Sequence, residues 1–206
     1  MATHRTLESM GSSQHDIDPA GDLVLLVGVD EDSKLLRVSS RVLTLASPVL
    51  SALLSPRFKE GNSLAGSTGL PQIPFPEDNP EAMEWLCQAL HFKIKVTDVV
   101  SFPLVKNLAV LCDKYDLSIA LGPWNEHLMQ TWRGSVDGVD RHPQLLWVSY
   151  ALDNQYRFWK TSKELLRLYT SDDLVLAGNE LANNILPDRV FGRFAHRIKW
   201  FLADAF

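Results

Sequence analysis

Two short apolar helices separated by a Ser-Pro step are the feature that most constrains the fold of this chain. The segment from Leu35 to Gly61 begins with an extended apolar piece and continues with apolar residues at helical spacing. Pro48 disfavours the helical conformation at Ser47, yet proline fits the first turn of a new helix. We therefore expect a strand, a short helix, a break at Ser47 and a second short helix that ends near Ser55. This order of elements is uncommon.

Strands are predicted on both sides of this segment. The continuous apolar run from Leu23 to Val27 is typical of a strand that is buried on both faces. An acidic turn follows at residues 30–33, and the piece from Leu35 to Val38 returns as an antiparallel partner. Further along, Ile73 and Phe75 alternate with prolines, which predicts an edge strand.

Three amphipathic helices should follow the strands. Asn79 supplies a cap before Pro80, so the first helix begins there. The second should begin at about Pro103 and the third near Pro123. The first two helices place these residues on their inward faces: Met83, Leu86, Cys87 and Leu90, then Leu104, Val105, Leu108, Leu111, Cys112 and Tyr115. The expected fold class is α+β, a small and mainly antiparallel sheet flanked by a helical cluster.

The chain divides into four parts by pattern. Residues 1–20 are polar and lack a period, so we expect a disordered leader. Residues 21–132 form the predicted α+β domain, and residues 133–142 have the composition of a linker. Residues 143–206 are predicted to be an all-helical extension. In the extension, one apolar stripe continues towards Trp159 and contains Leu145, Val148, Ser149, Leu152 and Tyr156.

Charge and cysteine content narrow the functional classes. The net charge of −5 argues against nucleic acid as a partner, because its phosphates require clustered lysine and arginine. No apolar run approaches membrane-spanning length, so a membrane partner is not indicated either. Cys87 and Cys112 both lie within apolar helical patterns, which predicts buried, reduced thiols and a cytoplasmic or nuclear compartment.

Residue patterns predict no catalytic site, cofactor, small-molecule ligand or metal. The loop that begins at Gly61 has a faint phosphate-loop spacing, but Ser67 stands where a lysine is needed. The six histidines do not form metal-ligand pairs at helical spacing, and the two cysteines are far apart. An enzyme with its site in the C-terminal half remains the alternative from another class.

Several segments together resemble the BTB/POZ domain family. The strand Asp22–Gly28, the stretch Val38–Leu54, the triplet Phe58-Lys59-Glu60 and the later segment Asp113–Leu117 occur in the family's order and at its spacing. The resemblance covers roughly residues 21–132. It implies the BTB/POZ fold and a protein-interaction module that is not an enzyme. The helical segment after residue 142 is similar in kind to the helices that often follow BTB domains.

The resemblance also implies partners. We expect a homodimer that forms through the first strand region and the first short helix, around Val42, Leu43 and Leu45. In BTB adaptors of cullin-RING ubiquitin ligases, a hydrophobic-x-Glu triplet contacts the cullin scaffold, and Phe58 and Glu60 match that triplet in type and place. An adaptor would also bind a protein substrate that the sequence does not identify. The alternative is a BTB scaffold or transcriptional regulator that acts without cullin.

A basic ridge is predicted on the last helix of the extension. Arg189, Arg193 and Arg197 are spaced four residues apart, opposite the apolar stripe of that helix. They form either a solvated face or a docking site for an acidic partner.

Overall fold

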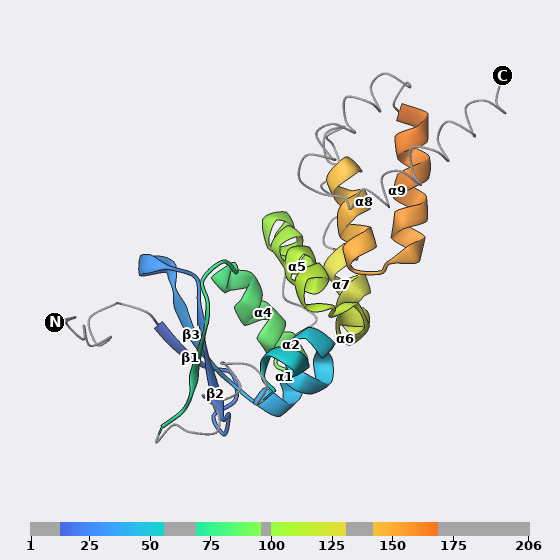
Figure 1. Cartoon of the computed structure of the whole chain (residues 1–206). Coiled ribbons are helices and arrows are strands. Elements are labelled where there is room, and N and C mark those ends of the chain that lie inside the picture. The colour runs from blue at the N-terminus through green and yellow to red at the C-terminus, as the bar shows by residue number, and fades with distance from the viewer. Residues whose placement is uncertain (1–12, 56–68, 96–99, 131–141, 169–206) are drawn as a thin grey trace. The chain divides into compact units, whose positions relative to one another are not determined.

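The computed structural model describes residues 13–55, 69–95, 100–130 and 142–168 (Figure 1). The chain forms two compact units, residues 1–128 and residues 129–206. The first unit contains a four-stranded sheet and a helical cluster, and the described part of the second is helical. The α+β class is therefore confirmed for the first unit.

The centre of the sheet is an antiparallel pair, β2 (Leu23–Val27) and β3 (Lys34–Val38), in which Leu25 lies opposite Leu36. The short 3-10 helix η2 (Asp30–Asp32) connects them. Four of the five β2 residues are buried and the fifth is half-buried, so the prediction of a strand covered on both faces is confirmed. The strand is therefore formed by a continuous apolar run that is buried on both faces, and not by alternating apolar and polar residues.

The expectation of a mainly antiparallel sheet is wrong. The strand order is β1-β3-β2-β4, and β4 (Gln72–Phe75) pairs with β2 in the parallel sense. The other edge strand, β1 (Ser13–Asp16), also pairs in parallel, with β3. The long connections that precede both pairings allow parallel strands, whereas tight turns would require antiparallel ones. The prediction that Ile73 and Phe75 lie on an edge strand is confirmed.

The N-terminal leader is not disordered throughout, because β1 and Ile17 are ordered parts of the first unit. Ile17 is 7% exposed, and β1 extends the sheet through backbone pairing with β3. An edge strand can form on backbone hydrogen bonds without an apolar pattern of its own. Its polar sequence therefore gave no sign of a strand.

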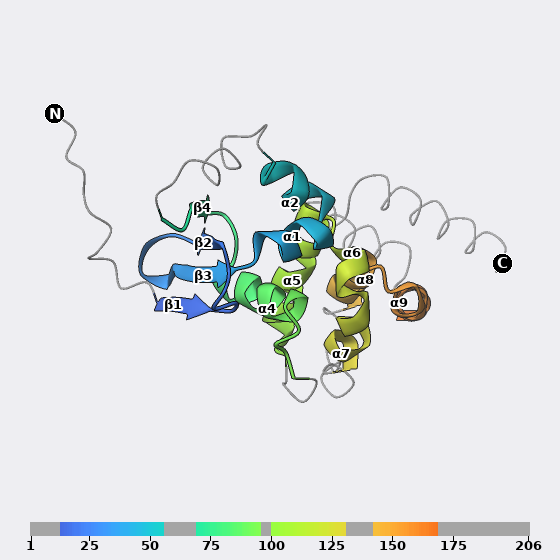
Figure 2. The same ribbon diagram turned by 90° about the horizontal axis from the view of Figure 1, so that it is seen from below.

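The two short helices and their break are as predicted. Helix α1 spans Ser40–Ala46 and α2 spans Pro48–Leu53, with Ser47 in an extended conformation between them. Figure 2 shows the two helices side by side, next to α5 (Phe102–Tyr115). Together they form a helical hairpin at the edge of the helical cluster.

Helices α4 (Pro80–Leu90) and α5 supply most of the core on one side of the sheet (Figure 1). The side chain of Asn79 accepts a hydrogen bond from the N–H of Ala82 at 2.9 Å, and Ser101 caps α5 in the same way. All the residues predicted on the inward faces of these helices are buried. In α4 and α5, the apolar residues at helical spacing are therefore the ones that pack in the core, and capping residues precede both helices.

Where the third helix was predicted, near Pro123, the chain forms the 3-10 helix η3 (Gly122–Trp124) and then α7 (Asn125–Gln130). The short helix α6 (Ser118–Leu121), which was not predicted, precedes them. The ring of Trp124 meets the ring of Trp85 edge to face, with centroids 6.1 Å apart. This aromatic contact joins η3 to α4.

The described part of the second unit is a hairpin of α8 (His142–Ala151) and α9 (Gln155–Leu168). Asp153 takes a left-handed conformation, and the side chain of Asn154 accepts a hydrogen bond from the N–H of Arg157 at 2.9 Å. The predicted continuous stripe therefore ends at this turn. Tyr156 and Trp159 were expected to face inward, but they are 60% and 52% exposed.

Candidate protein-interaction surface

Ser47 fixes the break between α1 and α2. Its hydroxyl oxygen accepts a hydrogen bond from the N–H of Leu50 at 2.9 Å, which caps α2. The same hydroxyl donates to the carbonyl oxygen of Tyr115 at 2.5 Å, at the end of α5. Ser47 is fully buried. One side chain therefore starts α2 and anchors the hairpin to the core.

Asp22 and His91 hold the start of α1. The Asp22 carboxylate accepts hydrogen bonds from the N–H and the hydroxyl of Ser40, each at 2.7 Å. Partial burial of Asp22 opposes its ionisation, but the hydrogen bonds from Ser40 outweigh this effect and lower its pKa. The N–H of Ser39 donates to Nε2 of His91 at 3.1 Å. The hairpin is thus held at its start, at its break and along its buried side.

The three residues predicted to mediate self-association lie in different environments. Leu43 is 1% exposed and belongs to the core, so its assignment to a contact surface is wrong. Val42 is half-buried, and Leu45 is 80% exposed. Because α1 has only seven residues, its one buried position, Leu43, is enough to attach it to the core. Leu45 is left facing outward.

Exposed apolar residues continue from α1 onto α2. Val49 is 40% exposed, and Pro48 and Ala52 are also exposed. Val49 and Ala52 are three residues apart on α2 and therefore share a face of that helix. We refer to Leu45, Pro48, Val49 and Ala52 as the α1–α2 surface. Its residues are apolar, and the polar contacts of Ser47, Asp22 and His91 hold its backbone in place.

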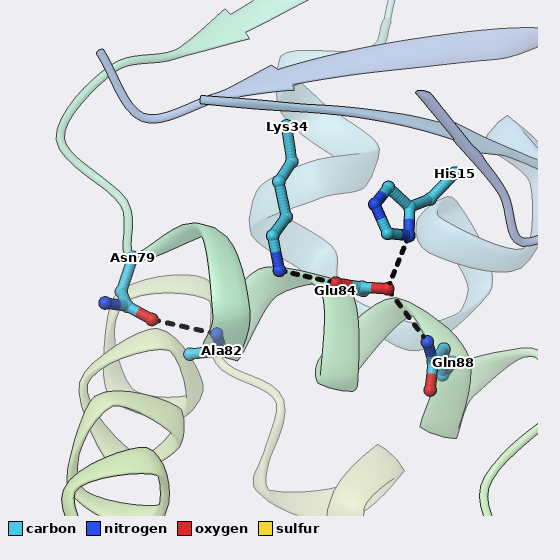
Figure 3. A network of polar contacts seen from close by, with 6 residues as sticks. All are labelled: His15, Lys34, Asn79, Ala82, Glu84 and Gln88. Atoms are coloured by element: carbon cyan, nitrogen blue, oxygen red, sulfur yellow. Dashed lines mark hydrogen bonds and ion pairs between the residues drawn. The ribbon is translucent and has the colours of Figure 1, made fainter. Parts of the chain in front are cut away.

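A polar cluster around Glu84 links the sheet to α4 (Figure 3). Its carboxylate accepts a hydrogen bond from Nζ of Lys34 on β3 at 2.7 Å and lies 2.9 Å from Nδ1 of His15 on β1. Nε2 of Gln88, one helical turn along α4, donates to the same carboxylate at 3.2 Å. All three partners converge on one carboxylate that is 15% exposed. This cluster holds β1 against the fold and has the character of a structural link.

A second buried carboxylate, Asp78, links the start of α4 to the end of α5. Its oxygens accept hydrogen bonds from the phenol of Tyr115 and, at 2.7 Å, from Nζ of Lys114. Burial, and then the hydrogen bond to Asp78, raise the pKa of Tyr115, which stays protonated and donates. Asp116 then ends α5 in a left-handed conformation, and the fully buried Leu117 follows it. The main role of the segment Asp113–Leu117 is therefore to contribute side chains to the core and to the Asp78 contacts.

The two cysteines are buried and free, as predicted. Burial, with a smaller effect of nearby Glu84, raises the pKa of Cys87 to about 12, so its thiol stays protonated at neutral pH. Such a thiol is a poor nucleophile. Across residues 13–55, 69–95, 100–130 and 142–168, histidine, cysteine and acidic side chains form no group of three that could hold a metal ion.

Two predicted sites lie outside the described residues. They are the cullin-contact pair, Phe58 and Glu60, and the basic ridge, Arg189, Arg193 and Arg197. Both remain predictions from the sequence.

Sequence reasoning missed the residues that connect distant segments. Asp78 stands directly before the cap residue Asn79. Its position is only a weak signal that its carboxylate contacts another segment of the chain. Glu84 and Gln88 have the spacing of a helical pair, but nothing in the sequence relates them to His15. Contacts that join residues far apart in sequence have no local signal.

The comparisons do not place the chain in a family: no protein-family model and no curated protein matches it. In the part of the chain that the structure describes, no helix is long and apolar enough to span a membrane.

Proposed function

We propose that the chain is a protein-interaction module of the BTB/POZ type that self-associates through the α1–α2 surface and acts in the cytoplasm or nucleus. The order of sequence segments supports the family. The exposed apolar residues on an anchored hairpin support the surface.

The observation that carries the proposal is the contrast between Leu43 and Leu45. The first is 1% exposed and the second is 80% exposed, although they lie two residues apart on one short helix. A leucine side chain left in water adds almost nothing to folding, whereas its burial against a partner contributes about 2 kcal/mol. A symmetric dimer would bury two copies of the surface against each other.

Light scattering on the purified chain tests the proposal. The wild-type chain should have the mass of a dimer at tens of micromolar, and Leu45→Glu should be monomeric, since a carboxylate in an apolar interface is strongly unfavourable. Ile119→Glu is the matched control, because Ile119 is 92% exposed on α6 and should leave the dimer intact. A monomeric wild-type chain would overturn the self-association proposal.

A more specific version is that the module is a substrate adaptor for a cullin-RING ubiquitin ligase. Its support is the triplet that contains Phe58 and Glu60, which follows the second short helix in the sequence. Co-purification with a BTB-type cullin should succeed for the wild-type chain and fail for the double variant Phe58→Ala, Glu60→Ala. If equal amounts of cullin co-purify with the wild-type chain and the double variant, Phe58 and Glu60 do not form the cullin contact. If cullin co-purifies with neither, a scaffold or transcriptional regulator that acts without cullin is favoured.

A further inference from the structure

The turn that ends α4 displays an aromatic side chain in an uncommon way. Phe92 has a positive φ of 56° and is 84% exposed. Its N–H donates to the carbonyl oxygen of Ala89 at 3.1 Å, and the N–H of Lys93 donates to that of Gln88 at 2.8 Å. This pair of hydrogen bonds ends a helix with one left-handed residue, a position that glycine usually takes. Here a phenylalanine takes it.

Two hydrogen bonds of His91, the residue before Phe92, hold the backbone of this turn in place. Nδ1 of His91 lies 2.7 Å from the carbonyl oxygen of Cys87, and Nε2 accepts the N–H of Ser39 at 3.1 Å. Because Nε2 accepts, Nδ1 carries the hydrogen and donates to Cys87. His91 therefore joins the end of α4 to the start of α1. A ring presented on such a turn loses little backbone freedom when a partner binds.

Folding does not explain the choice of phenylalanine at this position. A left-handed conformation is less favourable for any residue with a Cβ atom than for glycine, and a ring that is 84% exposed gains little from burial. Both effects favour glycine for stability. Strained backbone conformations of this kind gather at functional positions.

The residue that follows the ring in the sequence adds a positive charge. Lys93 is exposed. An aromatic anchor followed directly by an exposed lysine fits an apolar side chain with a carboxylate beside it. An extended anionic surface such as a membrane or nucleic acid fits less well, because the chain as a whole carries a net charge of −5.

We propose that Phe92 and Lys93, which we call the Phe92 turn, dock a short acidic segment of a partner protein that carries an apolar side chain. The ring of Phe92 packs on that apolar side chain, and Lys93 faces a neighbouring carboxylate. This proposal does not rest on self-association through the α1–α2 surface.

Selection of short random peptides on the immobilised full chain tests the proposal. The enriched peptides should carry aspartate or glutamate beside an apolar residue. The dissociation constant of a synthetic enriched peptide should rise roughly tenfold or more with Phe92→Gly and several-fold with Lys93→Glu, whereas Ile119→Ala should leave it unchanged. Higher salt should also weaken binding.

Stability measurements on the same variants separate a docking role from a structural one. Phe92→Gly should have a urea midpoint equal to or above that of the wild-type chain, because glycine suits the left-handed position. Its oligomeric mass should also be unchanged. A lowered midpoint, enriched peptides without acids, equal binding to Phe92→Gly, or binding only to anionic phospholipid vesicles would each overturn the proposal.

Discussion

Helix α1 begins beside the end of α4, where the N–H of Ser39 donates to His91, yet the two helices use their apolar residues in opposite ways. Helix α4 buries seven of its eleven residues, whereas α1 buries only Leu43 among its seven. A side-chain oxygen accepts a backbone N–H at the start of each helix, from Asn79 for α4 and from Asp22 for α1. The difference lies in what their remaining apolar side chains face.

This contrast teaches that apolar residues in one small unit need not share one role. Those of α4 contribute to the cohesion of the core, and two carboxylates add polar links, Asp78 just before the helix and Glu84 within it. Those of the α1–α2 surface are not needed for folding and remain available for a partner. Substitutions on the two sides should therefore separate stability from association.

The largest effect is expected for Leu43→Ala, which removes a side chain that is 1% exposed. The variant should lose about 2–5 kcal/mol of unfolding free energy, because it leaves a cavity in the core. Urea unfolding measures this loss. Leu45→Ala is the matched control; at a protein concentration at which the chain is monomeric, it should change the free energy by less than about 0.5 kcal/mol. Equal losses for both variants would remove the distinction between the inward and outward faces of α1.

Asp78→Ala should have the next largest effect on stability. It leaves the buried phenol of Tyr115 without its acceptor and removes the nearer of the two carboxylates that Lys114 contacts, which should cost about 2–3 kcal/mol. The neighbouring Glu77→Ala serves as the control, because the Glu77 side chain is 87% exposed. If both variants unfold at the same urea concentration, the Asp78 cluster is not a link in the core.

Glu84→Ala should cost about 1–2 kcal/mol, because its carboxylate is partly shielded and serves three partners. The loss should be local. Amide hydrogen exchange in β1, which His15 ties to α4, should accelerate more than exchange in β2. Gln88→Ala is the control, since it removes only one neutral donor. Uniform acceleration across the sheet would show that Glu84 does not hold β1 specifically.

The smallest effect is expected for Asp22→Ala, at about 0.5 kcal/mol after allowance for its solvent exposure. The folded protein lowers the pKa of Asp22, so its contribution is fully present above the ordinary aspartate pKa and is lost as pH falls through the lowered one. Urea unfolding of both forms at neutral pH and in acid measures this. The difference between wild type and variant should shrink in acid. A difference that grows would contradict the assigned hydrogen bonds to Ser40.

The sequence predicts elements whose signals are local. Helices α4 and α5 follow from apolar periodicity, together with Asn79 as the cap of α4. The break at Ser47 follows from the proline after it. In each case one short window of residues contains both the reason for the element and the reason for its end.

The remaining features depend on contacts between distant residues. Strand β1 forms because the backbone of β3 is available beside it, and its own residues are polar. Helix α1 has apolar residues on several sides, so its sequence cannot tell which of Leu43 and Leu45 faces the core. The left-handed conformation of Phe92 arises from hydrogen bonds at the end of α4, where a phenylalanine gives no sign of it. Such features require the tertiary structure.

The molecular mass of the chain in solution tests the central proposal most directly. Sedimentation equilibrium on the wild-type chain, Leu45→Glu and Ile119→Glu compares the α1–α2 surface with an exposed apolar residue elsewhere in the same unit. We expect dimers for the wild type and Ile119→Glu, and a folded monomer for Leu45→Glu. A monomeric wild type, or a Leu45→Glu variant that remains a dimer, would contradict self-association through the α1–α2 surface.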